Sequence, residues 1–237
     1  MDLGEKDRIL TILSREAGKL GAVAKGSRGG TSKLSGATEP FTYSRMLLAS
    51  GRSLDIISQC EIRESFPALR NDLQMLARAQ YFCELTDRFM LDREPNAEVF
   101  DLLLSALYLL KRMRDQPDVI THAFELHLLA ERGYTPELDI CVRCGERVLD
   151  LKAGFSPALG GALCISHNTS AQDAFTVRPA ALELMRTLLR AEPEELVMIK
   201  PDSSAMLDID RCLRWYIRYR TEYDIKSALF LDMVRRM

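Results

Sequence analysis

The stretch LDIISQCEIRESFPALRNDLQMLA, residues 54–77, decides the fold, because strand-like sequence gives way to helix-like sequence within it. Residues 54–63 are rich in branched side chains, which is typical of β-strands. Pro67 suits the first turn of a helix, and apolar residues then recur at helical spacing, at Leu69, Leu73, Leu76 and Ala77. We therefore predict a β domain over residues 1–65 and a helical domain over residues 66–237.

The sequence before residue 54 contains further short runs with the composition of strands. These runs cover residues 8–15, 20–25 and 43–49, and glycine-bearing segments divide them. Strands this short, with turns at this spacing, favour a small barrel or sandwich over alternating β–α units. The segment 26–33 has almost no apolar residue, so we expect it to form a basic loop between two strands.

The sequence after residue 66 is helical in pattern. Residues 96–114 are apolar nearly all round, which predicts a buried central helix. Further helices are expected over a segment opened by Pro117 and over residues 179–191, 203–219 and 227–236. The predicted fold class is α+β, with an N-terminal β domain, a helical body and one polar insert at about residues 138–172.

The insert carries two pairs of metal-ligand residues. Cys141 and Cys144 stand two residues apart in a turn completed by Gly145, and Cys164 and His167 repeat that spacing nineteen residues later. Three thiolates and one imidazole suit tetrahedral zinc, and protein ligands fill all four positions. We therefore predict a structural zinc site made by Cys141, Cys144, Cys164 and His167, with a short hairpin over residues 155–163 between the two pairs.

The remaining cysteines and histidines do not form a second site in this interpretation. Cys212 shares a helical face with apolar residues and is expected in the core, while Cys60 lies in a strand and Cys83 in a helix. His127 lies on an apolar helix face, and His122 has no partner that the sequence identifies. The chain also has no phosphate loop, dinucleotide fingerprint, His-Glu-x-x-His motif or nucleophile elbow, which argues against an enzyme.

Charge is unevenly distributed along a chain whose formal net charge is −2. The segment 15–36 has five basic residues and one acid, and the segment 211–237 has seven basic residues and three acids. Two basic ends fit a polyanionic partner, although an ordinary solvated surface gives similar counts. Candidate phosphate-binding residues in the first segment are Arg15, Lys19, Lys25, Arg28 and Lys33, with Phe41 and Tyr43 as stacking or core aromatics.

The second basic segment has a helical pattern. Arg211, Arg214 and Arg218 follow one another at i, i+3 and i+7, beside an apolar face that includes Cys212 and Tyr216. Two interpretations stay open for this arginine stripe. It is either solvated surface, or a surface that holds phosphate or the carboxylates of a partner by forked hydrogen bonds.

Taken in order, these features resemble the bacterial RecO family of recombination mediators. The resemblance spans nearly the whole chain, and the combination of motifs is more specific than any one of them. It rests on residues 4–11 (GEKDRILT), 18–26 (GKLGAVAKG), 39–41 (EPF), 124–129 (FELHLL), 133–136 (GYTP), 141–145 (CVRCG) and 226–227 (KS).

The resemblance implies an N-terminal OB-fold, a helical domain and a zinc-ribbon-like insert. Family members usually have an extra strand before the Gly4-Glu5 stretch, so an OB-fold lacking its first strand is one expectation here. The implied function is to bind single- and double-stranded DNA, to anneal complementary strands, and to act with RecR and single-strand-binding protein, through that protein's acidic tail, in loading RecA. With no signal peptide or transmembrane stretch in the sequence, a cytoplasmic place at the bacterial nucleoid is expected.

Two other classes of function stay open at this point. A zinc-ribbon scaffold for protein interactions would bind DNA only incidentally. A zinc-dependent nucleic-acid enzyme would need an open metal position and a His-x-Glu motif, which the chain lacks.

Overall fold

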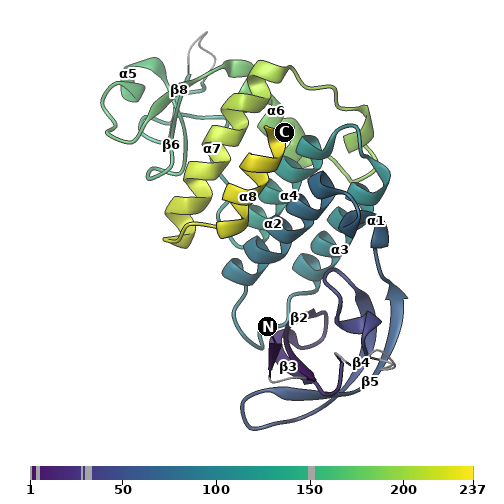
Figure 1. Ribbon diagram of the computed structural model, residues 1–237. Coiled ribbons are helices and arrows are strands. Elements are labelled where there is room, and N and C mark those ends of the chain that lie inside the picture. Colours follow the sequence, from purple (N-terminus) through teal and green to yellow (C-terminus); the bar gives the residue numbers. More distant parts are fainter. Residues whose placement is uncertain (1, 4–5, 28, 30–33, 149–152, 237) are drawn as a thin grey trace. The chain divides into compact units, whose positions relative to one another are not determined.

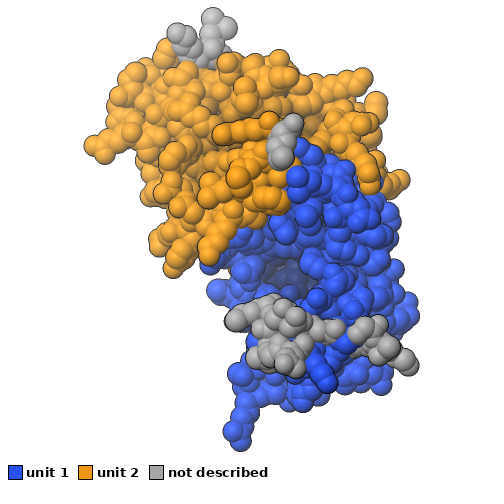
Figure 2. Space-filling model, in the orientation of Figure 1, with its two compact units in different colours: residues 1–111 blue, residues 112–237 orange. Residues whose placement is uncertain are grey.

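The structure is a computed structural model that describes residues 2–3, 6–27, 29, 34–148 and 153–236. The chain forms two compact units, residues 1–111 and residues 112–237 (Figure 2). The first contains the N-terminal sheet and three helices, and the second contains the remaining helices and the cysteine-bearing insert (Figure 1). A sheet followed by helices confirms the predicted α+β class, while the domain boundary at residue 65 stays a prediction.

The N-terminal sheet has five strands in the order β1-β2-β3-β5-β4. The β3–β5 pair is parallel and the other pairs are antiparallel. Side chains alternate between buried and half-buried along β3, because successive residues of a strand face opposite sides of the sheet. The strands are β1 (Asp2–Leu3), β2 (Asp7–Ser14), β3 (Gly18–Ala24), β4 (Tyr43–Ala49) and β5 (Asp55–Glu64).

One side of this sheet forms a small core of its own. Leu20, Ala22, Ala24 and Ile57 are buried there. The two alanines leave room for larger partly buried side chains from neighbouring strands, which include Leu10, Ile12 and Met46. Five strands in a non-sequential order agree with an OB-like domain. The two-residue strand β1 lies at the edge of the sheet, beside β2. The family resemblance had left open whether the OB-fold has this first strand.

Three helices complete the first unit: α1 (Pro67–Arg70), α2 (Leu73–Phe89) and α3 (Ala97–Arg112). The change from strands to helices expected after residue 65 is therefore confirmed. Asp72 begins α2, because its carboxylate accepts hydrogen bonds from the backbone N–H groups of Gln74 and Met75. The α2–α3 connection lies against the start of β3, where a Cβ on Gly18 (φ +68°) would lie 2.2 Å from the carbonyl oxygen of Glu94.

The helical body of the second unit is built around α4 (Pro117–Glu131), which packs against α6 (Pro179–Arg190) and α7 (Ser203–Thr221). Ten of the fifteen residues of α4 are buried. The expectation that residues 96–114 form the buried central helix was wrong, since α3 buries only Val99, Ala106, Leu107 and Leu110. Apolar residues lie all round α3, but most of its other apolar side chains are only half-buried. By contrast, α4 buries polar as well as apolar side chains, and those polar side chains have partners.

The insert consists of a three-stranded sheet, ordered β7-β6-β8, and one short helix. The hairpin of β6 (Ala153–Ser156) and β7 (Gly161–Leu163) was predicted, but the third strand, β8 (Phe175–Val177), was not. Glycine is needed at position 161, because a Cβ there would lie 2.2 Å from the carbonyl oxygen of Glu137. The other elements of this unit are α5 (Ile165–Asn168), α8 (Lys226–Arg235) and a 3-10 turn at Leu196–Met198; a second such turn, Gly36–Thr38, belongs to the first unit.

Candidate metal centre and nucleic-acid interface

The four predicted metal ligands lie together in the insert. The ligand atoms of Cys141, Cys144, Cys164 and His167 are all within 4.8 Å of one another. The Nδ1 atom of His167 is 3.2 Å from the sulfur of Cys164 and 3.6 Å from that of Cys141, and the sulfurs of Cys144 and Cys164 are 4.0 Å apart. In a tetrahedral site with metal–sulfur bonds of about 2.3 Å, two sulfurs lie about 3.8 Å apart. The cluster therefore has the size of a metal-binding site.

Backbone turns bring each pair of ligands to a common point. The N–H of Gly145 donates to the carbonyl of Cys141 at 2.8 Å, and Gly145 has φ of +75°, which glycine adopts without a Cβ penalty. The first turn of α5 brings the second pair together, since the N–H of His167 donates to the carbonyl of Cys164 at 3.1 Å. Local sequence alone therefore places two ligands at each turn.

The Cys141 thiol is the most buried ligand and the one best prepared to bind a cation. Burial raises its pKa, but backbone hydrogen bonds from Cys164, Cys144 and Arg143 outweigh that effect and lower the pKa of Cys141 to about 6. Metals bind the thiolate form. Cys144 is exposed and Cys164 and His167 are half-buried, so the cluster lies at the surface of the insert.

The first unit places the N-terminal candidate residues in different environments. The guanidinium of Arg15 is paired with Asp101 at 2.9 Å. The ammonium of Lys19 lies 3.2 Å from the carboxylate of Asp87 and 3.4 Å from that of Asp92, and its side chain is only 17% exposed. Both cations already have acidic partners within the unit.

Lys25 differs from these two residues. It is exposed at the end of β3 and makes no ion pair within the part of the chain that the structure describes. Arg28 and Lys33 lie outside the described residues. Of the predicted N-terminal cations that the structure describes, Lys25 alone therefore has no acidic partner among the described residues.

Two cations that the sequence reasoning missed resemble Lys25 in this respect. Arg45 on β4 and Arg52 in the β4–β5 loop are exposed and have no acidic partner among the described residues. Glu61 lies opposite Arg45 in the strand pairing, but its carboxylate pairs with Arg63 at 3.0 Å. Both arginines lie outside the basic segment 15–36, so a count of charge along the sequence could not find them. The alternation of β4 could have shown Arg45 on an outward position.

The predicted aromatic candidates lie near β4. Tyr43 is half-buried, and its ring meets the ring of Phe100 edge-on with centroids 6.0 Å apart. Phe41 is half-buried and has φ of +65°. The Tyr43 contact favours the packing interpretation for that ring.

Each arginine of the predicted C-terminal stripe has an intramolecular partner. Arg211 stacks over the ring of Phe175 at 4.0 Å, and Arg218 pairs with Asp224 at 3.1 Å. Arg214 lies deeper, where its side chain is 33% exposed and pairs with Asp232 at 2.6 Å and with Asp210 at 3.8 Å. Within the stripe, Arg214 therefore contributes to packing between helices, whereas Arg211 and Arg218 lie at the surface.

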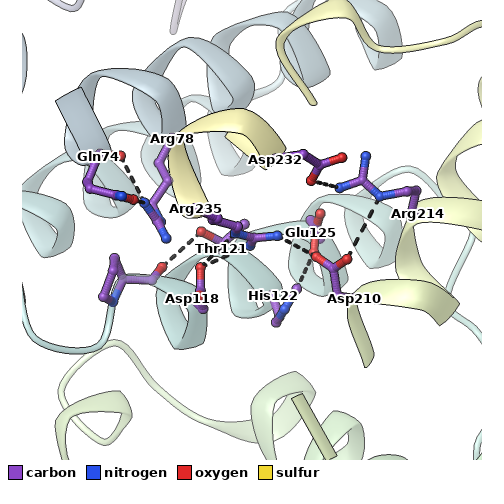
Figure 3. A network of polar contacts seen from close by, with 11 residues as sticks. Gln74, Arg78, Asp118, Thr121, His122, Glu125, Asp210, Arg214, Asp232 and Arg235 are labelled. Carbon is purple, nitrogen blue, oxygen red and sulfur yellow. Dashed lines mark hydrogen bonds and ion pairs between the residues drawn. The ribbon is translucent and has the colours of Figure 1, made fainter. Parts of the chain in front are cut away.

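Arg214 belongs to a network that joins three helices (Figure 3). Arg235 on α8 contacts Asp118 on α4 and Asp210 on α7, and Asp210 also faces Arg214. Burial lowers the pKa of Arg235, but the two carboxylates outweigh burial and raise that pKa above its usual range. These ion pairs hold α8 against α4 and α7.

Both histidines outside the cluster have partners. The Nδ1 atom of His122 lies 2.7 Å from a carboxylate oxygen of Glu125, and both side chains are almost fully buried. The sequence reasoning missed this pair, although His and Glu three residues apart on a helix are a usable signal. His127 is half-buried, and its Nε2 atom lies 3.1 Å from the carbonyl oxygen of Leu188, so its ring has a hydrogen-bond partner. Cys212 is buried as predicted, and burial raises the pKa of its thiol.

Comparison with known proteins defines the class to which this fold and site belong. Two family models, for the N-terminal and C-terminal parts of recombination protein O, match residues 1–66 and 70–228. The chain belongs to the RecO family of DNA repair and recombination proteins, and its role lies in DNA repair as a recombination mediator.

Individual relatives agree over nearly the full length. The DNA repair protein RecO of Symbiobacterium thermophilum is 40% identical over 98% of this chain and 92% of its own. That of Pelotomaculum thermopropionicum is 39% identical over 98% and 89%, and that of Heliobacterium modesticaldum is 37% identical over 98% and 86%. Among the described residues, no helix is both long and apolar enough to cross a membrane.

Proposed function

We propose that the chain binds single- and double-stranded DNA through the N-terminal sheet and anneals complementary strands. The observation that supports this most directly is the set of exposed cations without acidic partners among the described residues: Lys25, Arg45 and Arg52. A cation that is already paired gains less from phosphate than an unpaired one, because it must first give up its carboxylate. An unpaired cation releases the counterions of the phosphate at no such cost. The β4–β5 loop, which carries Arg52, is also one of the loops by which OB-folds bind oligonucleotides.

Annealing follows from this surface without any catalytic residue. Two complementary strands repel each other through their phosphates, and a protein that neutralises both lowers that repulsion. Base pairing then supplies the driving force. The chain acts as a binding protein in this proposal, and an enzymatic role is not needed.

A strand-annealing assay tests the proposal. We expect the wild-type chain to speed annealing of complementary oligonucleotides, and Arg45→Glu with Arg52→Glu to lose most of that effect. Arg190→Glu with Lys200→Glu makes the same change of charge on exposed residues of the second unit and should keep it. Equal loss in both double variants would assign the effect to overall charge and overturn the proposed site.

The cysteine cluster supports a bound zinc ion with a structural role. Cys141, Cys144, Cys164 and His167 would hold it, and a tetrahedral set of four protein ligands leaves no position for water or substrate. This point also disfavours the alternative of a zinc-dependent nucleic-acid enzyme. When bound, zinc would cross-link the turn at residues 141–145 to the turn at residues 164–167.

The partners that we propose are RecR and single-strand-binding protein, with RecA loaded as the result, at the bacterial nucleoid. Arg211 and Arg218 are the cations of the stripe that an acidic tail can reach, since both are exposed and the pair of Arg218 with Asp224 is an exposed one, whereas Arg214 is less exposed and is held by Asp210 and Asp232. On DNA coated with single-strand-binding protein, Arg211→Glu with Arg218→Glu should impair annealing more than on bare DNA. Equal impairment on both substrates would argue against contact with the tail.

A further inference from the structure

The C-terminal half of α7 carries two large aromatic side chains that are about half exposed. Trp215 is 48% exposed and Tyr219 is 51% exposed. They stand four residues apart, so they occupy neighbouring positions on the helix surface. Trp215 is also the only tryptophan in the chain. Single exposed apolar residues are ordinary, but tryptophan and tyrosine are enriched at interfaces, so two of them at neighbouring positions mark a candidate binding surface.

Each of the two rings has an arginine close to it. The guanidinium of Arg218 lies 5.3 Å from the centre of the Trp215 ring, and that of Arg220 lies 5.5 Å from the centre of the Tyr219 ring. Arg220 is held further by the rings of Tyr134 and Tyr216, at 5.7 and 4.7 Å. It has no carboxylate partner among the described residues. The aromatic pair thus lies beside a positive charge that the fold leaves unmatched.

The charge of the surrounding segment has the same sign. Residues 211–226 contain four arginines and one lysine but only two acids, Glu222 and Asp224. Asp224 pairs with Arg218 in an exposed ion pair, which contributes little and can open. An anion can therefore approach this face of α7.

We propose that Trp215 and Tyr219 form a stacking surface for the unpaired bases of a single nucleic-acid strand. This inference rests on the proposed DNA-binding function and adds a second site to it, in the other compact unit. Four residues of helix rise about 6 Å. Bases stacked along a strand are about 3.4 Å apart, so one ring inserted between two bases separates them by about 7 Å. Trp215 and Tyr219 are thus about 6 Å apart along the helix axis, which is close to that base separation in an extended strand, with Arg218 and Arg220 beside the phosphates.

A duplex fits this surface poorly, because its bases are already stacked and their faces are covered. An acidic peptide would satisfy the arginines but would leave the flat faces of two aromatic rings without a matching partner. Base–aromatic stacking contributes roughly 1–3 kcal/mol per base and accepts any base. The surface should therefore prefer single strands and show little sequence preference.

Fluorescence of the single tryptophan gives a direct test on the full chain. Oligodeoxythymidylate of roughly 20 nucleotides, longer than the usual site of one binding module, should quench Trp215 strongly. An abasic strand of the same length has the same phosphates and should leave the emission nearly unchanged. Equal effects from the two strands would mean that this surface contacts only phosphates, and would overturn the inference. Quenching by an acidic peptide but not by oligodeoxythymidylate would overturn it in favour of a peptide site.

Substitutions supply the second test, with binding followed by anisotropy of an end-labelled strand. Trp215→Ala or Tyr219→Ala should weaken single-strand binding about fivefold or more, whereas Trp215→Phe should keep it, because phenylalanine still stacks. Leu229→Ala removes a side chain that is 63% exposed on α8 and is the matched control. If Arg45→Ala with Arg52→Ala weakens binding and the aromatic variants do not, the inference fails while the proposed function stands. If wild type does not bind single strands at all, both fail.

Discussion

Three exposed cations of the N-terminal sheet and two arginines of the C-terminal helices differ in what they contact. The sheet keeps Lys25, Arg45 and Arg52 exposed and without acidic partners among the described residues. In the C-terminal helices, Arg214 and Arg235 are paired with carboxylates and tie α4, α7 and α8 together. A count of basic residues therefore says little about phosphate binding, which depends on whether a cation's charge is already matched.

The largest expected effect concerns the metal. Chelation, or Cys141→Ser, should unfold the insert, because binding free energy in a structural zinc site is on the order of 10 kcal/mol and supports local folding. Arg211 would then lose its contact with the ring of Phe175 in β8. Metal analysis of the purified chain should give about one zinc per chain.

The sheet should keep its DNA affinity after this treatment, because it belongs to the other compact unit and contributes none of the four ligands. Circular dichroism combined with a binding titration measures both effects. A folded, freshly purified chain without metal, or a parallel loss of DNA binding on chelation, would contradict this account.

The next largest effect concerns the ion pairs that Arg235 makes between the C-terminal helices. Arg235→Met should lower the free energy of unfolding by about 2–3 kcal/mol, because it removes a largely buried cation that faces the carboxylates of both Asp118 and Asp210. Arg190→Met, at a side chain that is 71% exposed, should change it by less than about 0.5 kcal/mol. Urea denaturation of both variants measures the difference. Equal stability would mean that the network does not hold α8 in place.

A smaller effect is expected for the sheet. Arg45→Ala with Arg52→Ala should weaken DNA binding about 10- to 100-fold, which corresponds to about 1.4–2.7 kcal/mol, while the free energy of unfolding stays nearly unchanged. Neither arginine makes an ion pair among the described residues, so the fold has little to lose. Unchanged affinity at low salt would move the DNA site elsewhere.

The smallest effect separates two arginines of one helix. Arg214→Gln should destabilise the second unit by about 1 kcal/mol, because Asp232 and Asp210 lose a partner. Arg218→Gln, which gives up only an exposed ion pair with Asp224, should leave stability within about 0.5 kcal/mol. Thermal unfolding distinguishes them, and reversed effects would refute the division of the stripe.

The sequence predicted the parts of the molecule that local patterns determine. Most strands and helices, the change from strand to helix after residue 65 and the clustering of the four predicted ligands followed from local spacing, because neighbouring residues make these features, whereas β8 was missed. The partners of Lys19, 68 and 73 residues away, and the pairing of Arg235 with Asp118, come from tertiary contacts. Arg45 was missed because its surroundings depend on the pairing of β4 with β5, which places it opposite Glu61, whose carboxylate is paired with Arg63.

The salt dependence of single-strand binding tests the central claim most directly. Each phosphate contact contributes about 0.7 to the slope of log affinity against log salt for single strands. We expect Arg45→Ala with Arg52→Ala to reduce the slope by about 1.4, and Arg190→Ala with Lys200→Ala to leave it unchanged. An unchanged slope in the Arg45 and Arg52 variant, or an equal reduction in both, would contradict the claim that the unpaired cations of the sheet hold the phosphates.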